Sequence, residues 1–354
     1  MIPLLKFLLW FADNSGKVEP NKIRGWLNMI GCYATGIFPR SKELVEVTRL
    51  YERGKISNQR LEKAFDKATV EIIDAQSSAN FSYVTDGMLK WQDLMRPFAA
   101  NIHGLKVDGL ARWFNNNLFY RKPIVISEIE HEESIIEHII QLKFLPKASS
   151  WKAILLAPYT FAQLCENHFY KNKSELMFKY AGILRDEIKR LVEVGFSYVQ
   201  LSDPALVCTL DNTKTSTGKL ASVKEALRII TEGTSVKTCL QTFFGDFSQI
   251  LPEAIDFPVD HLGIDLCETN FEILKEYSFE KGVALGLVNC CNSLLEDPSK
   301  QLIIAKEILE AIYPSKICDV FVCPNCDLEF LPLDKAVEKM RVTATVASLL
   351  KEEF

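Results

Sequence analysis

Short apolar runs alternate with longer helical segments along most of the chain, and this alternation restricts the fold more than any other feature of the sequence. Nine runs have the length and content of β-strands: residues 32–38, 81–85, 124–126, 153–157, 198–201, 236–243, 261–264, 283–288 and 320–323. Strands separated by helices form parallel sheets with crossover helices. The run at 124–126 is short and lies behind Pro123, so we interpret it as part of a loop excursion. The eight remaining strands predict a (β/α)8 barrel, and an open, doubly wound sheet is the alternative.

Two of the segments between the strands carry clear helix patterns. Residues 175–194 place apolar side chains near a 3.6-residue repeat with charges on the other face, and Gly195 follows as a C-terminal stop. Residues 301–312 form a second predicted helix, which Asp297 or Ser299 caps and Pro314 ends. Both segments are long enough to cross from one strand to the next.

The chain contains no Pro/Ser-rich linker or low-complexity tract that would divide it. We therefore expect one barrel domain over residues 31–354, preceded by an N-terminal extension of residues 1–30. The apolar run at residues 1–12 is interrupted by Lys6 and is shorter than the ~18 residues that a membrane span needs. We interpret it as a docking helix, with a membrane-surface anchor as the alternative, and expect no membrane span.

Composition narrows the class of protein. The chain has 354 residues, of which 48% are hydrophobic and 25% charged, so it can bury a large core without disulfides. A formal net charge of -5 argues against nucleic acid as a partner. Ten Cys without a signal peptide indicate a reducing compartment, and we predict a cytoplasmic protein. Chemistry on a small molecule is the function class that remains.

The segment Cys323-Pro-Asn-Cys326 places a thiol directly behind the last predicted strand. A C-x2-C pair is typical of a zinc knuckle, but a knuckle needs a second ligand pair at short spacing, and none follows. Two interpretations remain: two unrelated thiols, or a metal site that Cys326 forms with residues from other strand ends. In a β/α barrel functional groups gather at the C-terminal ends of the strands, so those ends are the place to search.

Read in order, the strand ends resemble the catalytic barrel of cobalamin-independent methionine synthase, particularly its short, single-barrel relatives. The most specific motifs are Phe-Pro-Arg-Ser at 38–41, Ser-Asp-Pro-Ala-Leu at 202–206, Phe-Gly-Asp at 244–246 and Pro-Asn-Cys at 324–326, and the resemblance runs from about residue 31 to 349. It implies a TIM barrel of the methionine synthase/uroporphyrinogen decarboxylase type. It also implies an S-methyltransferase in which zinc activates the homocysteine thiolate for attack on the methyl group of a methylated folate or similar donor.

The family's zinc ligands are a His and a Cys on one strand, a carboxylate on the next and the Cys of the final strand. Of these, Cys326 is present, and Asp265 stands at the carboxylate position, with Glu268 as an alternative. Gln241 occupies the His position and Phe243 the paired Cys position; Gln is a poor zinc ligand and Phe is none.

Other residues bear on the same site. Cys239 shares strand parity with Gln241, so a relocated site of Cys326, Cys239 and Asp265 is an alternative to the family's set. His261 begins a strand and should lie at the opposite end of the barrel, where we expect a surface or packing residue. Cys290 and Cys291 are further thiols at a strand end, each with a structural alternative.

The resemblance also assigns substrate residues. The amino-acid head of homocysteine, or of a related thiol, should rest on backbone at Thr35, Gly36 and Ile37 and on the carboxylates of Asp86 and Asp203. The structural alternatives are a turn at Asp86-Gly87 and a helix start at Asp203-Pro204.

Trp91 and Tyr159 are candidates for stacking on a flat methyl donor, or are core aromatics. The donor is a methylated folate, another methylated pterin, a corrinoid protein or a group presented by a partner protein. Two other functions stay open: a degenerate barrel that lost part of the zinc site and acts as a binding or scaffold protein, and an enzyme of the uroporphyrinogen decarboxylase type.

Overall fold

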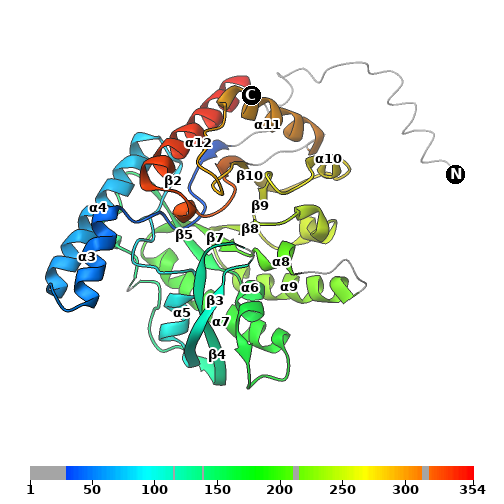
Figure 1. The fold of residues 1–354 in the computed structure, drawn as a ribbon. Helices are drawn as coiled ribbons and strands as arrows, with labels where there is room; N and C mark the ends of the chain where they lie inside the picture. Colours follow the sequence, from blue (N-terminus) through cyan, green and yellow to red (C-terminus); the bar gives the residue numbers. More distant parts are fainter. Residues whose placement is uncertain (1–28, 115, 138, 210–214, 313–318) are drawn as a thin grey trace, which may run out of the picture.

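Eight parallel strands form a nearly closed barrel in the computed structural model of the protein (Figure 1). The structure describes residues 29–114, 116–137, 139–209, 215–312 and 319–354. The barrel strands, in sheet order, are β1 (Met29–Cys32), β11 (Asp319–Pro324), β10 (Gly282–Val288), β9 (His261–Asp265), β8 (Lys237–Gln241), β7 (Phe196–Ser202), β5 (Ser150–Leu156) and β2 (Tyr83–Val84). Ser82 N donates to Cys32 O (2.9 Å) where β2 meets β1. The predicted TIM-barrel fold is confirmed, and the open sheet is excluded.

The first strand differs from its prediction. The apolar run 32–38 was expected to be extended, but β1 ends at Cys32 and residues 33–38 form the loop that follows it. The loop is buried, because it docks on the segment after β11, and burial rather than strand pairing explains its apolar sequence. The predicted extension 1–30 falls almost entirely outside the described residues, so its docking helix and the domain boundary stay predictions.

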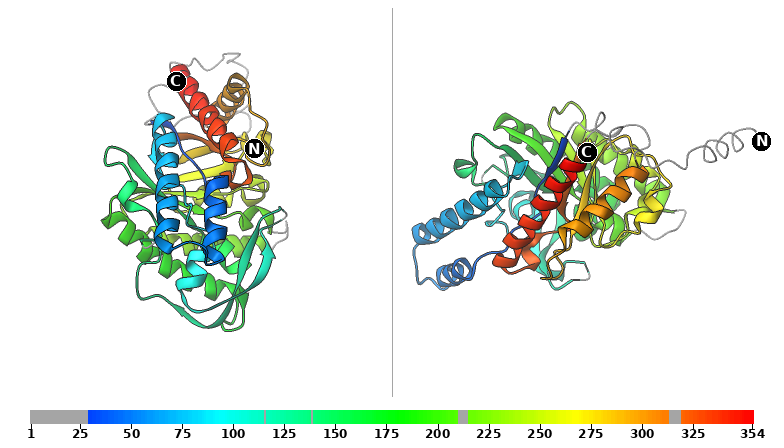
Figure 2. Two further views of the ribbon diagram at one scale, coloured as in Figure 1. Left: turned by 60° about the vertical axis from the view of Figure 1, so that its left-hand side comes forward. Right: turned by 90° about the horizontal axis from the view of Figure 1, so that it is seen from above.

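Helices surround the barrel (Figure 2). The longer ones are α3 (Lys42–Glu52), α4 (Asn58–Ser78), α7 (Lys173–Glu193), α9 (Thr215–Thr231), α11 (Pro298–Ile312) and α12 (Leu333–Glu353). The shorter ones are α5 (Arg96–Asn101), α6 (Pro158–Leu164), α8 (Ala205–Cys208), α10 (Phe271–Leu274) and the 3-10 turns η1 (Leu142–Phe144), η2 (Phe247–Ile250), η3 (Glu253–Asp256) and η4 (Leu328–Phe330). Among the described helices none is long and apolar enough to cross a membrane.

Both predicted helices are confirmed. Helix α7 matches residues 175–194 within two residues at its start, and Gly195 follows it with φ +108°, a left-handed conformation that Gly adopts without strain. Helix α11 begins three residues earlier than expected, and Asp297 Oδ1 accepts from Ser299 N (3.0 Å) at its start. Pro314 lies outside the described residues.

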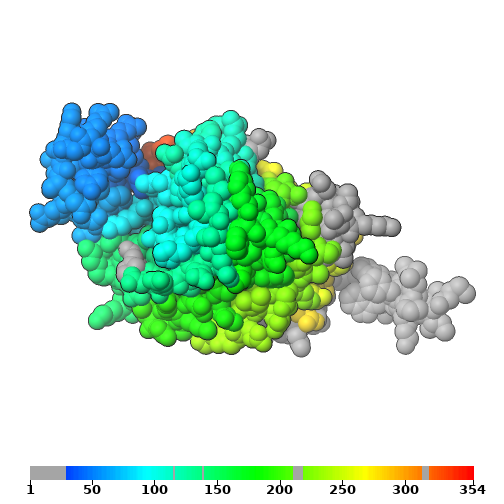
Figure 3. All heavy atoms as spheres, turned by 90° about the horizontal axis from the view of Figure 1, so that it is seen from below, coloured from blue at the N-terminus to red at the C-terminus, as the bar shows by residue number. Residues whose placement is uncertain are grey.

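Two additions project from the barrel. Helices α3 and α4 pack side by side as an arm, which Figure 3 shows as a lobe at one side of the molecule. The second addition is an antiparallel hairpin of β3 (His103–Arg112) and β4 (Phe119–Glu130), joined by β6 (Glu166–Asn167) into a three-stranded sheet. Residues 124–126 thus lie outside the barrel as predicted, but they belong to a strand of this sheet and not to a loop.

Side chains fill the interior of the barrel. Tyr33, Tyr198, Cys239 and Phe321 belong to one buried cluster, and Lys152 Nζ lies 3.2 Å from the centroid of the Tyr33 ring. Lys152 donates to Ala34 O (2.8 Å), and complete burial lowers its pKa to about 7. The barrel is therefore a packed core, and ligands have access only at its ends.

His261 lies at the opposite end of the barrel from the strand ends, as expected. It starts β9, is buried, and its Nε2 lies 3.1 Å from Asp319 Oδ2 at the N-terminal end of the barrel. Its ring stacks on that of Tyr198, with the centroids 5.4 Å apart. It is a packing residue.

Candidate functional site

A cleft of about 1070 Å³ opens at the C-terminal ends of the strands. Its walls come from the segments that follow β7, β8, β9, β10 and β11, and from the tip of the β3–β4 hairpin, which leans over this end of the barrel. Functional groups of β/α barrels gather at this end. The cleft is therefore the candidate site.

A pair of thiols lies at the cleft, and one of the two lines it. Cys326 Sγ is 3.7 Å from Cys291 Sγ; Cys326 is fully buried, whereas Cys291 is exposed and lines the cleft. Burial raises the pKa of Cys326 well above its usual value, and the contact with Cys326 lowers the pKa of Cys291. Cys323, the other half of the C-x2-C motif, lies instead in the barrel interior with Cys239. The motif does not act as a unit, and Cys291 is the partner of Cys326.

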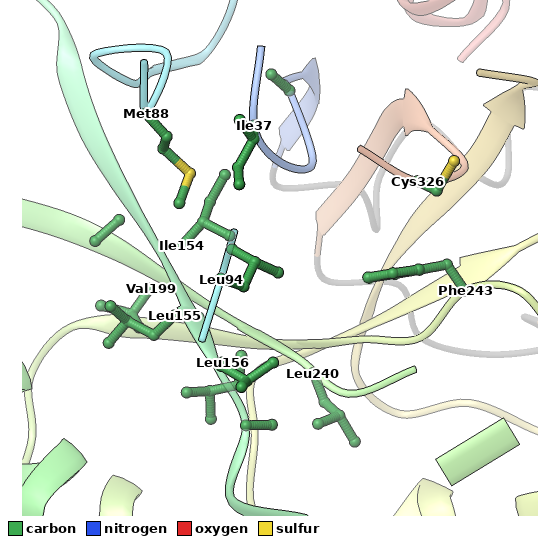
Figure 4. Close-up of a cluster of buried hydrophobic side chains, with 14 of the residues drawn as sticks. Ile37, Met88, Leu94, Ile154, Leu155, Leu156, Val199, Leu240, Phe243 and Cys326 are labelled. Carbon is green, nitrogen blue, oxygen red and sulfur yellow. The ribbon is translucent and has the colours of Figure 1, made fainter. Parts of the chain in front are cut away.

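Phe243 and Asp265 occupy two of the family's ligand positions. Phe243 is fully buried in the same core cluster as Cys326 (Figure 4). Asp265 accepts from Phe244 N (3.1 Å), Cys267 N (3.0 Å) and Asn325 Nδ2 (3.2 Å). Burial raises the pKa of Asp265 to about 6, although these hydrogen bonds act to lower it. The carboxylate thus holds the strand ends together.

Gln241 and Cys239 complete the predicted metal set. Gln241 Oε1 is buried without a hydrogen-bond partner in the described structure. Cys239 lies among aromatic side chains, with its Sγ 3.7 Å from the Tyr33 hydroxyl. Cys239 and Gln241 do share a face of β8, but Cys239 lies one pleat deeper, in the packed interior. The relocated set of Cys326, Cys239 and Asp265 is not assembled.

The predicted ligands can be compared with the ligand number and geometry that zinc requires. Within the described ranges, no three His, Cys, Asp or Glu side chains lie together as a metal site. The family's four positions therefore do not form a ligand set in this structure. However, two sulfurs that each lie ~2.3 Å from a tetrahedral zinc ion are roughly 3.8 Å apart, which is close to the 3.7 Å between Cys291 and Cys326. This pair fits two ligands of a zinc ion.

The loop after β1 docks beside the thiol pair. Thr35 Oγ1 donates to Cys326 O (2.6 Å), and Ile37 N donates to Asp327 Oδ1 (3.1 Å). A Cβ at Gly36 would lie 1.5 Å from the same oxygen, so only Gly permits this approach. The structure thus brings the three predicted loop residues to the predicted thiol, through Asp327, which the sequence analysis did not single out.

Four buried acceptor atoms near this loop have no hydrogen-bond partner in the described structure: Asp203 Oδ2, Asp327 Oδ2, Gln200 Oε1 and Gln241 Oε1. Gln200 Nε2 donates to Thr35 O (2.6 Å), and Asp203 N donates to Gln241 O (2.8 Å), so three of the four belong to the neighbouring ends of β7 and β8. Asp327 follows β11 and contacts the same loop through Ile37 N. Burial raises the pKa of both Asp203 and Asp327 to about 7. Buried acceptors are normally paired, and these four suit a ligand that brings donors.

The other oxygen of Asp203 is engaged by the protein. Asp203 Oδ1 accepts from Thr160 N (2.9 Å) and from the Thr160 hydroxyl, which in turn accepts from Ala205 N (3.0 Å). Asp203 therefore stabilises the helix start that was its structural alternative. Its Oδ2 atom still has no hydrogen-bond partner in the described structure and can accept a hydrogen bond from a ligand.

Asp86 stabilises a turn, which was the structural alternative to a role in substrate binding. Its Oδ1 accepts from Met88 N (3.0 Å) and its Oδ2 from Gln141 N (2.9 Å), and Gly87 has φ +77°. Each oxygen accepts one backbone N–H of the loop region, so the carboxylate of Asp86 holds the turn and the segment at Gln141 together.

The predicted donor residues do not line the cleft. Trp91 is buried against Phe98, with ring centroids 6.4 Å apart, and Tyr159 is buried in α6 with its hydroxyl 3.5 Å from Thr209 Oγ1. Both are core aromatics. The aromatic residues of the cleft are Phe114, Phe244 and Phe330.

Several residues of the site were not predicted from the sequence. Asp327, Gln200 and Phe330 lie within a few residues of predicted strand ends, so the strand-end rule would have found them. Phe114 was out of reach, because the hairpin that carries it is a separate sheet whose direction only the fold determines.

Comparison with known proteins agrees with this geometry. Residues 32–349 match the family model described as cobalamin-independent synthase, catalytic domain. The chain is 30% identical to a methionine synthase of Saccharolobus solfataricus over 90% of this chain and 94% of that protein, and 28% identical to one of Sulfurisphaera tokodaii over 90% and 92%. Its fold is similar to a B12-independent methionine synthase of a Shewanella species in complex with selenomethionine, with a TM-score of 0.76, 16% identity and coverage of 92% and 98%.

Proposed function

Because the chain belongs to the cobalamin-independent synthase catalytic-domain family, a family of methyltransferases, we propose that it transfers a methyl group to the thiol of homocysteine or a closely related thiol. The observation that carries the proposal is the group of unpartnered buried acceptors beside the Cys291–Cys326 pair. An amino acid with a sulfur at the end of a short side chain has the complementary groups, an ammonium at one end and a thiol at the other.

The acceptor's ammonium group binds to carboxylates in this proposal. Asp203 Oδ2 and Asp327 Oδ2 accept its hydrogens, and its positive charge favours their ionised forms in the buried site. The loop at Thr35, Gly36 and Ile37 holds Asp327 and the Cys326 carbonyl in place. The backbone contacts thus position the acceptor so that its sulfur extends toward the thiol pair, and positioning contributes to the rate.

Zinc is part of the proposal, held by Cys326 and Cys291, and Gln241 Oε1 is an unpartnered oxygen at one of the family's ligand positions. A bound zinc ion would keep the acceptor sulfur as a thiolate at neutral pH, where a free thiol of pKa about 8.5 is mostly protonated. Asp265 keeps its role at the strand ends.

The methyl donor enters through the cleft. A methylated folate or a similar flat donor is the expectation from the sequence, and delivery by a partner protein is its alternative. Any flat ring would meet Phe114, Phe244 and Phe330, because Trp91 and Tyr159 lie behind the walls. The nine described cysteines are all unpaired, which supports placing the reaction in a reducing compartment such as the cytoplasm.

Two measurements on the full chain test the proposal. Methionine formed from homocysteine is measured by mass spectrometry with methyltetrahydrofolate, a methylated corrinoid and a methylsulfonium as donors. Zinc content is measured by elemental analysis. We expect methionine with at least one donor and about one zinc ion per chain, with both lost in Cys326→Ala and zinc weakened in Cys291→Ser.

The matched control is Cys165→Ala, which removes a buried thiol at the end of α6, away from the cleft. This variant should keep both zinc and activity. If the wild-type protein binds no zinc and forms no methionine with any of these donors, the chain is instead a barrel that binds ligands without turnover.

A further inference from the structure

We propose that Lys339 is a positioning residue whose buried ammonium group keeps Cys291 beside Cys326. The inference rests on the proposed function for its chemical meaning, because the thiol pair is the centre of that proposal. Two observations carry it. The ammonium donates all three of its hydrogens to the segment that contains Cys291, and further hydrogen bonds connect this contact to the Cys291 backbone.

The ammonium group of Lys339 is enclosed by the protein. Lys339 lies on α12, which packs against β10 and β11, and its side chain is fully buried. It donates to Asn289 O (2.6 Å), Leu294 O and Glu296 Oε1 (2.8 Å). An ammonium group has three hydrogens to donate, so these acceptors satisfy it completely. All three acceptors belong to residues 289–297, the segment between β10 and α11.

Packing alone does not explain a charge at this position. A Met side chain has nearly the same length and could fill the same space without the cost of taking an ammonium group out of water. That cost is offset here by two carbonyl groups and the carboxylate of Glu296. We therefore attribute the charge of Lys339 to the conformation that it imposes on residues 289–297.

Most of this segment is exposed. Its first residues are tied to the neighbouring strand end, where Cys290 N donates to Asn325 Oδ1 (2.8 Å). Residues 291–295 are all exposed, Leu294 by 76%, and residues 289–297 form neither helix nor strand. An exposed, irregular segment has few buried apolar contacts to fix it. Its conformation therefore depends on hydrogen bonds more than on packing.

Hydrogen bonds continue from Lys339 to Cys291. Glu296 Oε1 accepts from Lys339 and also from Asn289 N (3.0 Å), so Asn289 is held at both its N–H and its C=O group. The Asn289 side chain in turn accepts from Cys291 N (2.8 Å), a local bond of the kind that fixes tight turns. The position of the Cys291 backbone thus depends on Lys339 through one intermediate residue.

Other contacts hold Cys326. It follows β11 by two residues, its side chain is fully buried in the main core cluster, and its carbonyl accepts from Thr35 Oγ1 (2.6 Å). Loss of the Lys339 ammonium should therefore move Cys291 and leave Cys326 in place. The 3.7 Å contact between the two sulfurs is the feature that this loss would change.

The position of both sulfurs matters for any ion or atom that they share. One zinc ion bonds to both sulfurs only if both reach it at once, and holding them in place beforehand removes the entropy cost of bringing them together. Residues that orient a metal ligand typically contribute about 10- to 100-fold to metal affinity. Lys339 should strengthen zinc binding by the thiol pair to this extent.

Two measurements on the full chain, one of them without metal, test the inference. Phenylarsine oxide bonds to two neighbouring thiols through one arsenic atom, so its binding to zinc-free protein reports whether Cys291 and Cys326 lie together. Peptide mass spectrometry identifies the bridged pair. Zinc affinity is measured by competition with a chromophoric chelator. In Lys339→Met we expect both affinities to fall about 10- to 100-fold.

A double-mutant cycle separates positioning from a general loss of stability. If Lys339 acts through Cys291, Lys339→Met should change zinc affinity by less than about twofold in the Cys291→Ser background. A loss that reflects only a weaker fold would be the same in both backgrounds. Glu296→Gln removes the charge that Lys339 contacts and keeps an acceptor for Asn289 N. It should give a smaller loss of both affinities, and it replaces Lys339→Met if that variant does not fold.

Two control variants lie on the same helix. Lys335→Met removes an ion pair with Glu338 (2.7 Å), and Val346→Ala removes buried packing about two turns beyond Lys339. Both variants should keep the affinity for zinc and for phenylarsine oxide. Val346→Ala should nevertheless lower the urea midpoint, so it shows what a loss of stability alone does to the thiol pair.

Three results would each overturn the inference. These are unchanged phenylarsine oxide binding in folded Lys339→Met protein, no bridged Cys291–Cys326 pair in the wild type, and an equal loss of zinc affinity in the two backgrounds. The proposed function can fail separately. If the wild type binds no zinc and forms no methionine, but the arsenic bridge forms and weakens in Lys339→Met, the positioning role stands and the proposed function is wrong.

Discussion

Replacing Asp203 by Asn tests whether the buried acceptor atoms recognise the ammonium group of an amino acid. Asn keeps the shape of the side chain and an oxygen for Thr160, but it removes the negative charge. Because Asp203 Oδ2 has no partner in the described structure, the ligand's ammonium is the donor that we expect there. Methionine, the product of the proposed reaction, is the ligand of choice because its thioether does not titrate.

The size of the effect follows from the burial of Asp203. A hydrogen bond between charged groups in a buried site contributes about 1.5–3 kcal/mol, so Asp203→Asn should weaken methionine binding about 10- to 150-fold at pH 8. Burial raises the pKa of Asp203 to about 7, and only the ionised form binds the ammonium. The ionised fraction of Asp203 falls roughly tenfold from pH 8 to pH 6, so wild-type affinity should fall at least tenfold, because burial raises the pKa of Asp327, the second carboxylate at the ammonium, to about 7 as well.

Isothermal titration at pH 6, 7 and 8 measures both effects. The matched ligand is 4-(methylthio)butanoate, which lacks the ammonium group and should bind wild-type and Asp203→Asn protein equally at pH 8. The matched variant is Asp86→Asn, whose carboxylate serves only the loop amides of Met88 and Gln141. It should keep the pH dependence of methionine binding.

The reasoning fails if Asp203→Asn binds methionine as tightly as the wild type does at pH 8. It also fails if the variant keeps the full pH dependence of the wild type, because only the share due to Asp327 should remain once residue 203 no longer titrates. A loss of affinity for the analogue without an ammonium group, equal to the loss for methionine, would show that Asp203 acts on the fold of the site instead.

Two further predictions concern the core. The pKa of Lys152 is lowered from 10.5 to about 7 by burial, so the unfolded chain binds more protons than the folded chain between these values, and stability rises with pH there by about 1.4 kcal/mol per unit. Lys152→Met should remove this rise in stability. The urea midpoint of the variant should therefore increase less between pH 7 and pH 9.5 than that of the wild type, and equal increases would contradict the prediction. Phe243→Ala should lower the free energy of unfolding by about 3–5 kcal/mol. The control is Phe169→Ala, which should change it little because Phe169 is 51% exposed. Equal losses of the two variants in urea titrations would refute the core role of Phe243.

Much of the fold was predictable from the sequence because a parallel barrel strand is buried on both faces. Its residues form a continuous apolar run, and seven of the eight runs lie at the observed strands. The exception was β1, where the run continues into the buried loop that contacts Asp327. An apolar run records burial, and it does not distinguish a buried strand from a buried loop.

The thiols show where sequence reasoning stopped. Parity along β8 correctly places Cys239 and Gln241 on the inner face, because side chains alternate along a strand. This alternation shows which face of the strand a side chain is on. It does not show how far along the barrel axis the side chain lies, because that position depends on how neighbouring strands are staggered. Cys239 therefore lies among the interior aromatics, while Cys291, from another strand end, contacts Cys326.

The sequence by itself determined the barrel and the family and singled out Cys326 as a candidate, because local periodicity and motifs at strand ends are properties of short segments. The tertiary structure decided the partners: Cys291 in place of Cys323, Asp327 beside the Thr35–Gly36–Ile37 loop, and Phe114 from a hairpin outside the barrel. These contacts join segments that are tens to hundreds of residues apart. Closure of the barrel and the stagger of its strands set such distances, and no single segment of the sequence contains that information.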